Sequence, residues 1–179
     1  MTKFTESMKA VLEAMRAGNV KRIITMSAWY TDPNTRAGQE MFDLMWSKVP
    51  GLVNTLDNEG EMDRMLAQTE EAISFTSVLV PTLSWDLRTD KEILTRPAST
   101  WVEGVSGLMS RQGENLPNLS QSHNCFLLFA DVARFLLSVV ETPDQWNRVA
   151  VAIATDYTRD EELEGFQRLR AHMEQLADK

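Results

Sequence analysis

The chain has 179 residues, 43% hydrophobic and 25% charged, which is enough for one soluble domain with its own core. Its formal net charge of −8 argues against a protein that binds nucleic acid, because that function needs a basic surface. No apolar run approaches the roughly 20 residues of a membrane span, no signal peptide is evident and Cys125 is the single cysteine, so we expect a cytoplasmic protein without internal disulfides.

Helical and strand patterns alternate along the first part of the chain. Gly18-Asn19 predicts the end of the first helix, because both residues tolerate left-handed backbone, and the apolar run 20–26 then predicts a strand that meets a loop at Ser27. The apolar face of that helix consists of Phe4, Met8, Val11, Leu12 and Met15.

The next three elements are two helices and a strand. A short helix over residues 40–49 precedes a second helix within 57–72, for which Asp57 or Asn58 is a candidate cap. The strand 73–81 follows and ends at Pro81. Helix–strand–helix–strand order predicts an α/β fold with a mostly parallel sheet flanked by helices.

The second half begins with an irregular stretch. Residues 82–121 predict long loops with a short element around 100–109, and 125–129 predict a short strand. The helix 130–140 and the strand 148–154 are predicted next, and an amphipathic helix ends the chain. The residues expected to face inward on helix 130–140 are Val132, Phe135, Leu136, Val139 and Val140.

Three segments carry a resemblance to a known family. They are "MKAVLEAMRAGNVKRIITMSA", "EMDRMLAQTEEAISFTSVLVPTL" and "FADVARFLLSVVETPDQWNRVAVAIA". In order and spacing the chain resembles the NmrA-like branch of the atypical short-chain dehydrogenases, and within it the biliverdin reductase B and flavin reductase proteins, over roughly residues 4 to 154. The resemblance implies that 1–155 form the C-terminal portion of a Rossmann-like NAD(P)-binding domain, with 156–179 as an appended C-terminal amphipathic helix.

The same resemblance implies hydride transfer from NADP(H) or NAD(H) to a flavin or tetrapyrrole substrate. Ser27 and Thr82 take the catalytic positions, and Ser27, Ala28, Pro81, Thr82 and Leu83 line the nicotinamide. Thr82 stands where biliverdin reductase B has a histidine, and a threonine hydroxyl cannot act as an acid near neutral pH. Flavin reduction needs less of the protein than bilin reduction, since it mainly requires that the two rings be positioned.

Several of these residues also have plainer interpretations. Ser27 can equally bond local backbone, and Trp29 and Tyr30 can pack on the sheet instead of forming a substrate platform, with Trp29 the candidate for substrate binding. His123 and Cys125 lie close together, but no further Cys or His pair completes a metal site, so we expect no metal.

The family pattern lacks its beginning here. A dinucleotide-binding domain opens with a strand and a Gly-rich turn, and none of the eight glycines forms such a turn. A truncated isoform or gene model would have this pattern. Strand 20–26 would then be an exposed apolar sheet edge, which flanking helices, a second copy or a partner would have to cover. The alternative function is a non-catalytic, NmrA-like binding or regulatory protein.

Overall fold

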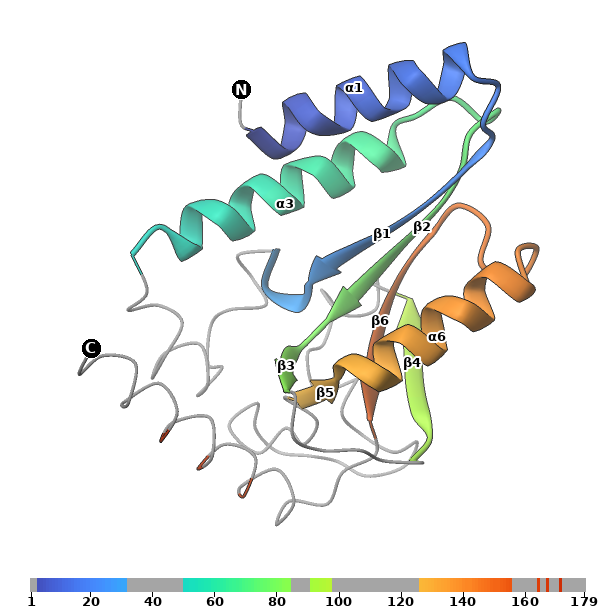
Figure 1. The fold of residues 1–179 in the computed structure, drawn as a ribbon. Coiled ribbons are helices and arrows are strands. Elements are labelled where there is room, and N and C mark those ends of the chain that lie inside the picture. The colour runs from blue at the N-terminus through green and yellow to red at the C-terminus, as the bar shows by residue number, and fades with distance from the viewer. Residues whose placement is uncertain are drawn as a thin grey trace.

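The structure, a computed structural model, describes residues 3–31, 50–84, 91–97 and 126–155 together with residues 164, 167 and 171. Its centre is a four-stranded sheet in the order β1-β2-β6-β4, beside a two-stranded sheet of β3 and β5 (Figure 1). The elements are α1 (Lys3–Ala17), β1 (Arg22–Ala28), the 3-10 turn η1 (Trp29–Thr31), α3 (Leu52–Ala67), β2 (Ser74–Val80), β3 (Thr82–Ser84), β4 (Ile93–Pro97), β5 (Phe126–Leu128), α6 (Phe129–Glu141) and β6 (Val149–Thr155).

Most neighbouring strands run parallel. β1 pairs with β2 along its whole length, from Arg22 opposite Ser74 to Ala28 opposite Val80, and β2 pairs in parallel with β6. Among the strands that the structure describes, only β4 runs antiparallel, against β6. The predicted α/β fold with a mostly parallel sheet is therefore confirmed, and the fold is Rossmann-like.

Helices cover both faces of the sheet (Figure 1). On one face α1 and α3 pack together over β1 and β2, and on the other face α6 packs over β2 and β6. The first of these clusters contains Met8, Leu12, Met15, Met62, Leu66, Ile73 and Phe75. The second contains Val78, Val80, Leu127, Val132, Phe135, Val139, Val151 and Ile153. A third, around the turn after β1, contains Trp29, Tyr30, Leu56, Leu79, Ala152 and Ala154.

Local sequence explains most of these boundaries. Asn19 has a positive φ of 54°, as the predicted stop at Gly18-Asn19 requires. Gly51, with a φ of 79°, is the residue from which α3 starts. The prediction that Asp57 or Asn58 caps this helix is wrong, because the helix begins at Leu52 and both residues lie inside it.

Two predicted helix faces are also partly wrong. Phe4 and Val11 of α1 are 39% and 43% exposed, because the buried stripe of that helix runs through Thr5 instead. Val140 of α6 is 60% exposed. The irregular stretch after Pro81 contains β3 and β4, which the sequence did not indicate.

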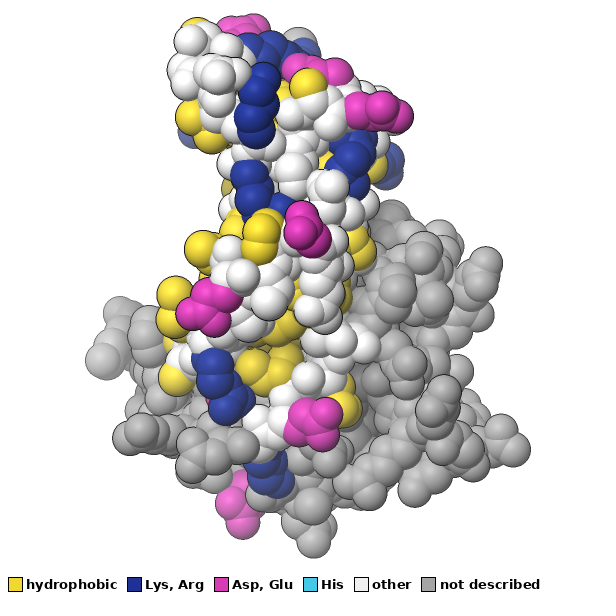
Figure 2. Space-filling view, turned by 90° about the vertical axis from the view of Figure 1, so that its right-hand side faces the viewer, with side chains coloured by type: hydrophobic (Ala, Val, Ile, Leu, Met, Phe, Trp, Pro, Cys, Tyr) yellow, Lys and Arg dark blue, Asp and Glu magenta, His cyan; other side chains and the backbone are white. Residues whose placement is uncertain are grey.

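Some predictions lie outside the described residues. They concern the short helix at 40–49, the element around 100–109, and most of the helix over 156–179, of which Glu164, Gln167 and Ala171 are described as helical and exposed. Among the described residues, no helix combines the length and apolarity needed to cross a membrane. Figure 2 shows hydrophobic side chains reaching the surface between charged groups.

Candidate functional site

The carboxyl ends of β1 and β2 lie side by side. Ser27 is opposite Leu79, and Ala28 is opposite Val80. The chain leaves the sheet at this end of both strands, continuing into η1 after β1 and into Pro81 after β2. Ligands of open parallel sheets bind at this edge. The register thus brings the predicted nicotinamide-lining residues of β1 next to those that follow β2.

The residues after β2 continue this edge. Pro81 is buried, and Thr82 opens β3, where it is the register partner of Phe126. Leu83 is half-buried against the cluster beneath α6. Thr82 and Leu83 are therefore held by the small second sheet, directly beyond the end of β2.

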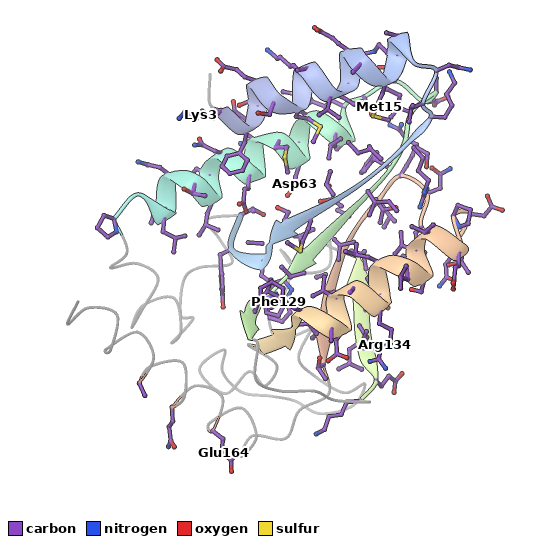
Figure 3. All side chains as sticks on the ribbon, viewed as in Figure 1. Lys3, Met15, Asp63, Phe129, Arg134 and Glu164 are labelled. Carbon is purple, nitrogen blue, oxygen red and sulfur yellow. The ribbon has the colours of Figure 1, made fainter. Side chains whose placement is uncertain are left out.

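The Ser27 hydroxyl faces helix α3. Its side chain is 4% exposed, and its Oγ donates a hydrogen bond of 2.7 Å to Oδ2 of Asp63. Ser77 of β2 donates a second bond of 2.7 Å to Oδ1 of the same carboxylate. Asp63 is placed between α3 and β1 in Figure 3. One carboxylate thus joins α3 to both central strands.

Two carboxylates of α3 titrate unusually at this place. Burial raises the pKa of Asp63, although the hydrogen bonds from Ser77 and Ser27 oppose the rise. Burial also raises the pKa of Glu59, and the neighbouring charge of Asp63 adds to it, while the N–H of Ala28 bonds the Glu59 carboxylate and opposes the rise. Glu59 and Asp63 are one helical turn apart, on the side of α3 that faces the end of β1.

This pair makes stability depend on pH. An acid whose pKa is higher in the folded protein contributes most below its unfolded pKa, near 4, and that contribution is lost as pH rises through the folded pKa. We expect the free energy of unfolding of Asp63→Asn to fall less than that of the unmodified chain between about pH 4.5 and 8. Urea denaturation across this range measures the difference, and parallel curves would contradict the assignment.

A surface pair acts in a separate pH window. Arg16 bonds Glu70 with its Nε at 2.7 Å and lowers the pKa of Glu70 to about 2. A lowered acid pKa stabilises above the unfolded value, and that stability is lost as pH falls from about 4.5 toward 2. The loss of stability that follows from ionisation of Glu59 and Asp63 therefore appears at higher pH. The Arg16–Glu70 pair does not mask it there.

The turn η1 is pinned against α3 and β2. The Trp29 indole N–H donates to the Leu79 carbonyl at 3.0 Å, and Trp29 is 1% exposed. Tyr30 is also buried. Both aromatic rings therefore belong to the core around η1, as the packing interpretation expected. The assignment of Trp29 to a substrate stays a prediction.

Gly60 permits the close contact between α3 and η1. A Cβ at this position would lie 2.8 Å from the backbone oxygen of Thr31, which is too close for any real Cβ. We expect Gly60→Ala to lower the free energy of unfolding by about 1–3 kcal/mol, because backbone cannot yield as a flexible side chain does. Gly18→Ala is the control, since its Cβ would meet Ala14 oxygen at 3.3 Å. Equal urea midpoints for the two variants would contradict this account.

Sequence reasoning missed Glu59, Asp63 and Ser77. On the sequence the two acids look like a solvated helix face, and Ser77 looks like one polar residue of a buried strand. One signal was available in the sequence. Glu59 and Asp63 are four residues apart, which is one helical turn, and Gly60 between them is an unusual residue in a helix interior. Within the described ranges, no group of three or more His, Cys, Asp or Glu residues is arranged to hold a metal ion.

The parallel register, the two helical layers and the open carboxyl edge define a Rossmann-like α/β protein. The sequence matches no protein-family model and no curated protein. The fold is similar to a wide-type short-chain dehydrogenase/reductase from Veillonella parvula, solved in complex with NADP, with a TM-score of 0.57 at 12% identity over 86% of this chain and 59% of that one.

The fold is also similar to the oxidoreductase ylbE from Lactococcus lactis, with a TM-score of 0.50 at 16% identity over 93% of this chain and 61% of that one. Such low identities show the fold alone, namely that of short-chain dehydrogenase/reductase and NAD(P)-binding oxidoreductase structures. The chain spans less than two thirds of the length of either protein. The finer assignment to the NmrA-like branch stays a prediction.

Proposed function

We propose that this chain forms the nicotinamide and substrate side of an NAD(P)(H)-binding site, at the carboxyl edge of β1 and β2. The observation that carries the proposal is the register that sets Ala28 opposite Val80, so that η1 and Pro81-Thr82 leave the sheet together. In open α/β sheets this edge receives the ligand. The NADP complex of the Veillonella parvula protein, whose fold is similar, supports the choice of nucleotide.

The reaction proposed for this site is hydride transfer from NADPH or NADH to a flavin or tetrapyrrole. The nucleotide supplies the hydride, and the protein has to hold the nicotinamide and the acceptor ring in contact. Thr82 follows Pro81 at the end of β2 and can offer a hydroxyl but no proton at neutral pH. This chemistry favours a flavin acceptor, which needs no acid from the protein.

A matched pair of variants tests the role of Ser27. Ser27→Ala and Ser77→Ala each remove one 2.7 Å hydrogen bond to Asp63, but only Ser27 lies at the carboxyl end of its strand. If Ser27 serves the reaction, flavin-dependent NADPH oxidation falls about tenfold or more in Ser27→Ala and stays near normal in Ser77→Ala. Equal turnover in the two variants, at equal stability, would leave Ser27 with a structural role only.

The second candidate function is binding without turnover. It is favoured by the position of Ser27, whose hydroxyl is buried and already donates to Asp63. A protein of this kind would bind NADPH or NADH and show no nucleotide oxidation with any flavin. Titration of the chain with NADPH and NADH, together with the flavin-dependent oxidation assay, therefore separates the two candidates.

A further inference from the structure

Helix α6 is apolar on the side that faces solvent as well as on the side that faces the sheet. It buries Val132, Phe135 and Val139 against the sheet. Leu137 and Val140 lie on its outer side, where they are 64% and 60% exposed, more than any other large hydrophobic residue that the structure describes. A helix that is apolar all round is usually buried on every side. The outer side of α6 therefore has the composition of a contact surface.

The exposed apolar residues of α6 form one continuous surface. They are Phe129, Ala130, Ala133, Leu137 and Val140, and we call them the outer α6 face. Each residue of a helix turns by about 100°, so these five positions together span only about 100° of the circumference. Leu137 lies opposite the buried side, and α6 has the sheet behind it (Figure 1). The outer α6 face therefore points away from the rest of the fold.

Two exposed charges, Arg134 and Glu141, lie side by side along one border of the outer α6 face. They are about 20° apart around the helix but about 10 Å apart along its axis. Arg134 bonds Asp131 and the Lys91 carbonyl through Nη2 alone, and its side chain is 49% exposed. Within the described ranges Glu141 forms no ion pair. Both groups are therefore available to a partner of opposite charge.

Glu141 also stands at an unfavourable end of its own helix. It is the last residue of α6, where unpaired carbonyl groups carry partial negative charge, and the last turn has no basic residue. An acid there opposes the helix dipole, so the stability of α6 does not explain its presence. A cation that approaches from outside the chain would offset this repulsion.

We propose that two copies of this chain associate through the outer α6 face, with the two helices antiparallel across a two-fold axis near Leu137. Arg134 and Glu141 lie at equal distances on either side of that axis. An antiparallel pairing places Arg134 beside the partner's Glu141 and Glu141 beside the partner's Arg134, on the same border of the contact. A parallel pairing would set like charges at the same level, so the charges select the antiparallel one.

The proposed contact is small. One pair of helices buries less than the roughly 1,600 Å² of a standard interface, and we expect a reversible dimer with a Kd on the order of 10–100 µM. At its centre Leu137 meets the partner's Leu137, and the two ion pairs close one border. No nucleotide takes part, so this association and the proposed function are tested independently.

Sedimentation equilibrium of the full chain, from about 5 µM to 1 mM, tests the contact. We expect a monomer–dimer equilibrium whose Kd rises about tenfold or more in Leu137→Lys, which puts a charge at the centre of the contact. Val11→Lys is the matched control, because Val11 is 43% exposed on α1, across the sheet from α6, and it should change the Kd by less than about twofold. A chain that stays monomeric at every concentration would overturn the proposal, and so would a dimer lost in Val11→Lys but kept in Leu137→Lys.

Charge reversal separates the ion pairs from general repulsion. Glu141→Lys and Glu13→Lys change the net charge of −8 equally, and relief of self-repulsion alone would strengthen association in both. We predict that Glu141→Lys raises the Kd about fivefold or more, whereas Glu13→Lys, an exposed position on α1, does not raise it. A Kd that is unchanged or lowered in Glu141→Lys would overturn the proposal.

A double-mutant cycle on the Kd tests the antiparallel orientation. The variants are Arg134→Gln, Glu141→Gln and the combination of both, and any effect of Arg134→Gln on its contact with Asp131 cancels in the cycle. We expect the loss in the combined variant to be smaller than the product of the two single losses by about threefold or more. A loss equal to that product would contradict the pairing. Should Leu137→Lys not fold, this cycle and Glu141→Lys decide.

Discussion

Trp29→Ala should lower the free energy of unfolding by about 4 kcal/mol, one of the two largest effects expected for a single substitution in this chain. Trp29 is 1% exposed and belongs to one buried cluster with Leu56, Leu79 and Ala152, so its removal opens a large cavity. The Leu79 carbonyl also loses the indole N–H that it accepts at 3.0 Å. Domains of this kind are stable by only about 5–15 kcal/mol, and the variant should therefore unfold at much lower urea concentration.

Two further substitutions separate the contributions of volume and hydrogen bonding at Trp29. Trp29→Phe keeps most of the apolar volume but removes the N–H, and it should cost about 1–3 kcal/mol. Val53→Ala, on the exposed first turn of α3, is the control and should change stability by less than about 0.5 kcal/mol. A loss in Trp29→Ala no greater than that of the control would mean that η1 is not packed into the core.

Asp63→Ala should lower the free energy of unfolding by about 2 kcal/mol or more. The reason is that the hydroxyls of Ser27 and Ser77, both at most 4% exposed, lose the acceptor that lies 2.7 Å from each of them. A buried hydroxyl without a partner costs about 1–3 kcal/mol, and the removal of one desolvated carboxylate offsets only part of the cost.

A cycle of variants isolates this effect. In a background of Ser27→Ala with Ser77→Ala, the substitution Asp63→Ala leaves no orphaned hydroxyl and removes a carboxylate that then has no donors. We expect it to be nearly neutral or stabilising there, so that the two backgrounds differ by about 2 kcal/mol. An equal cost of Asp63→Ala in both backgrounds, measured by urea denaturation, would contradict the bonding described for this cluster.

The sequence predicts those elements whose local signals agree with the fold. The strands around Ile24, Val78 and Val151 are short runs rich in apolar and β-branched residues between turn signals, and such runs have few alternatives to a buried parallel strand. The helix that contains Phe135 buries Val132, Phe135 and Val139 of its predicted face, although Val140 is exposed. These signals are local, which is why chain order and the parallel sheet follow from them.

The remainder depends on tertiary contacts. The start of α3 was misplaced because Gly51 caps it by conformation, without a side-chain hydrogen bond that a motif would reveal. Strand β4 pairs with β6 from a stretch poor in periodicity. The polar cluster needs Asp63, Ser27 and Ser77 to meet from three elements, and no spacing along the chain encodes that meeting.

The central claim is that the carboxyl edge of β1 and β2 binds a nicotinamide dinucleotide, and titration of the full chain with NADPH and NADH, followed by NMR, tests it most directly. We predict saturable binding below about 1 mM, a standard free energy of about −4 kcal/mol or better, with chemical-shift changes concentrated at Ala28, Pro81 and Leu83. No binding of either nucleotide at millimolar concentration, or shift changes confined to residues away from this edge, would contradict it.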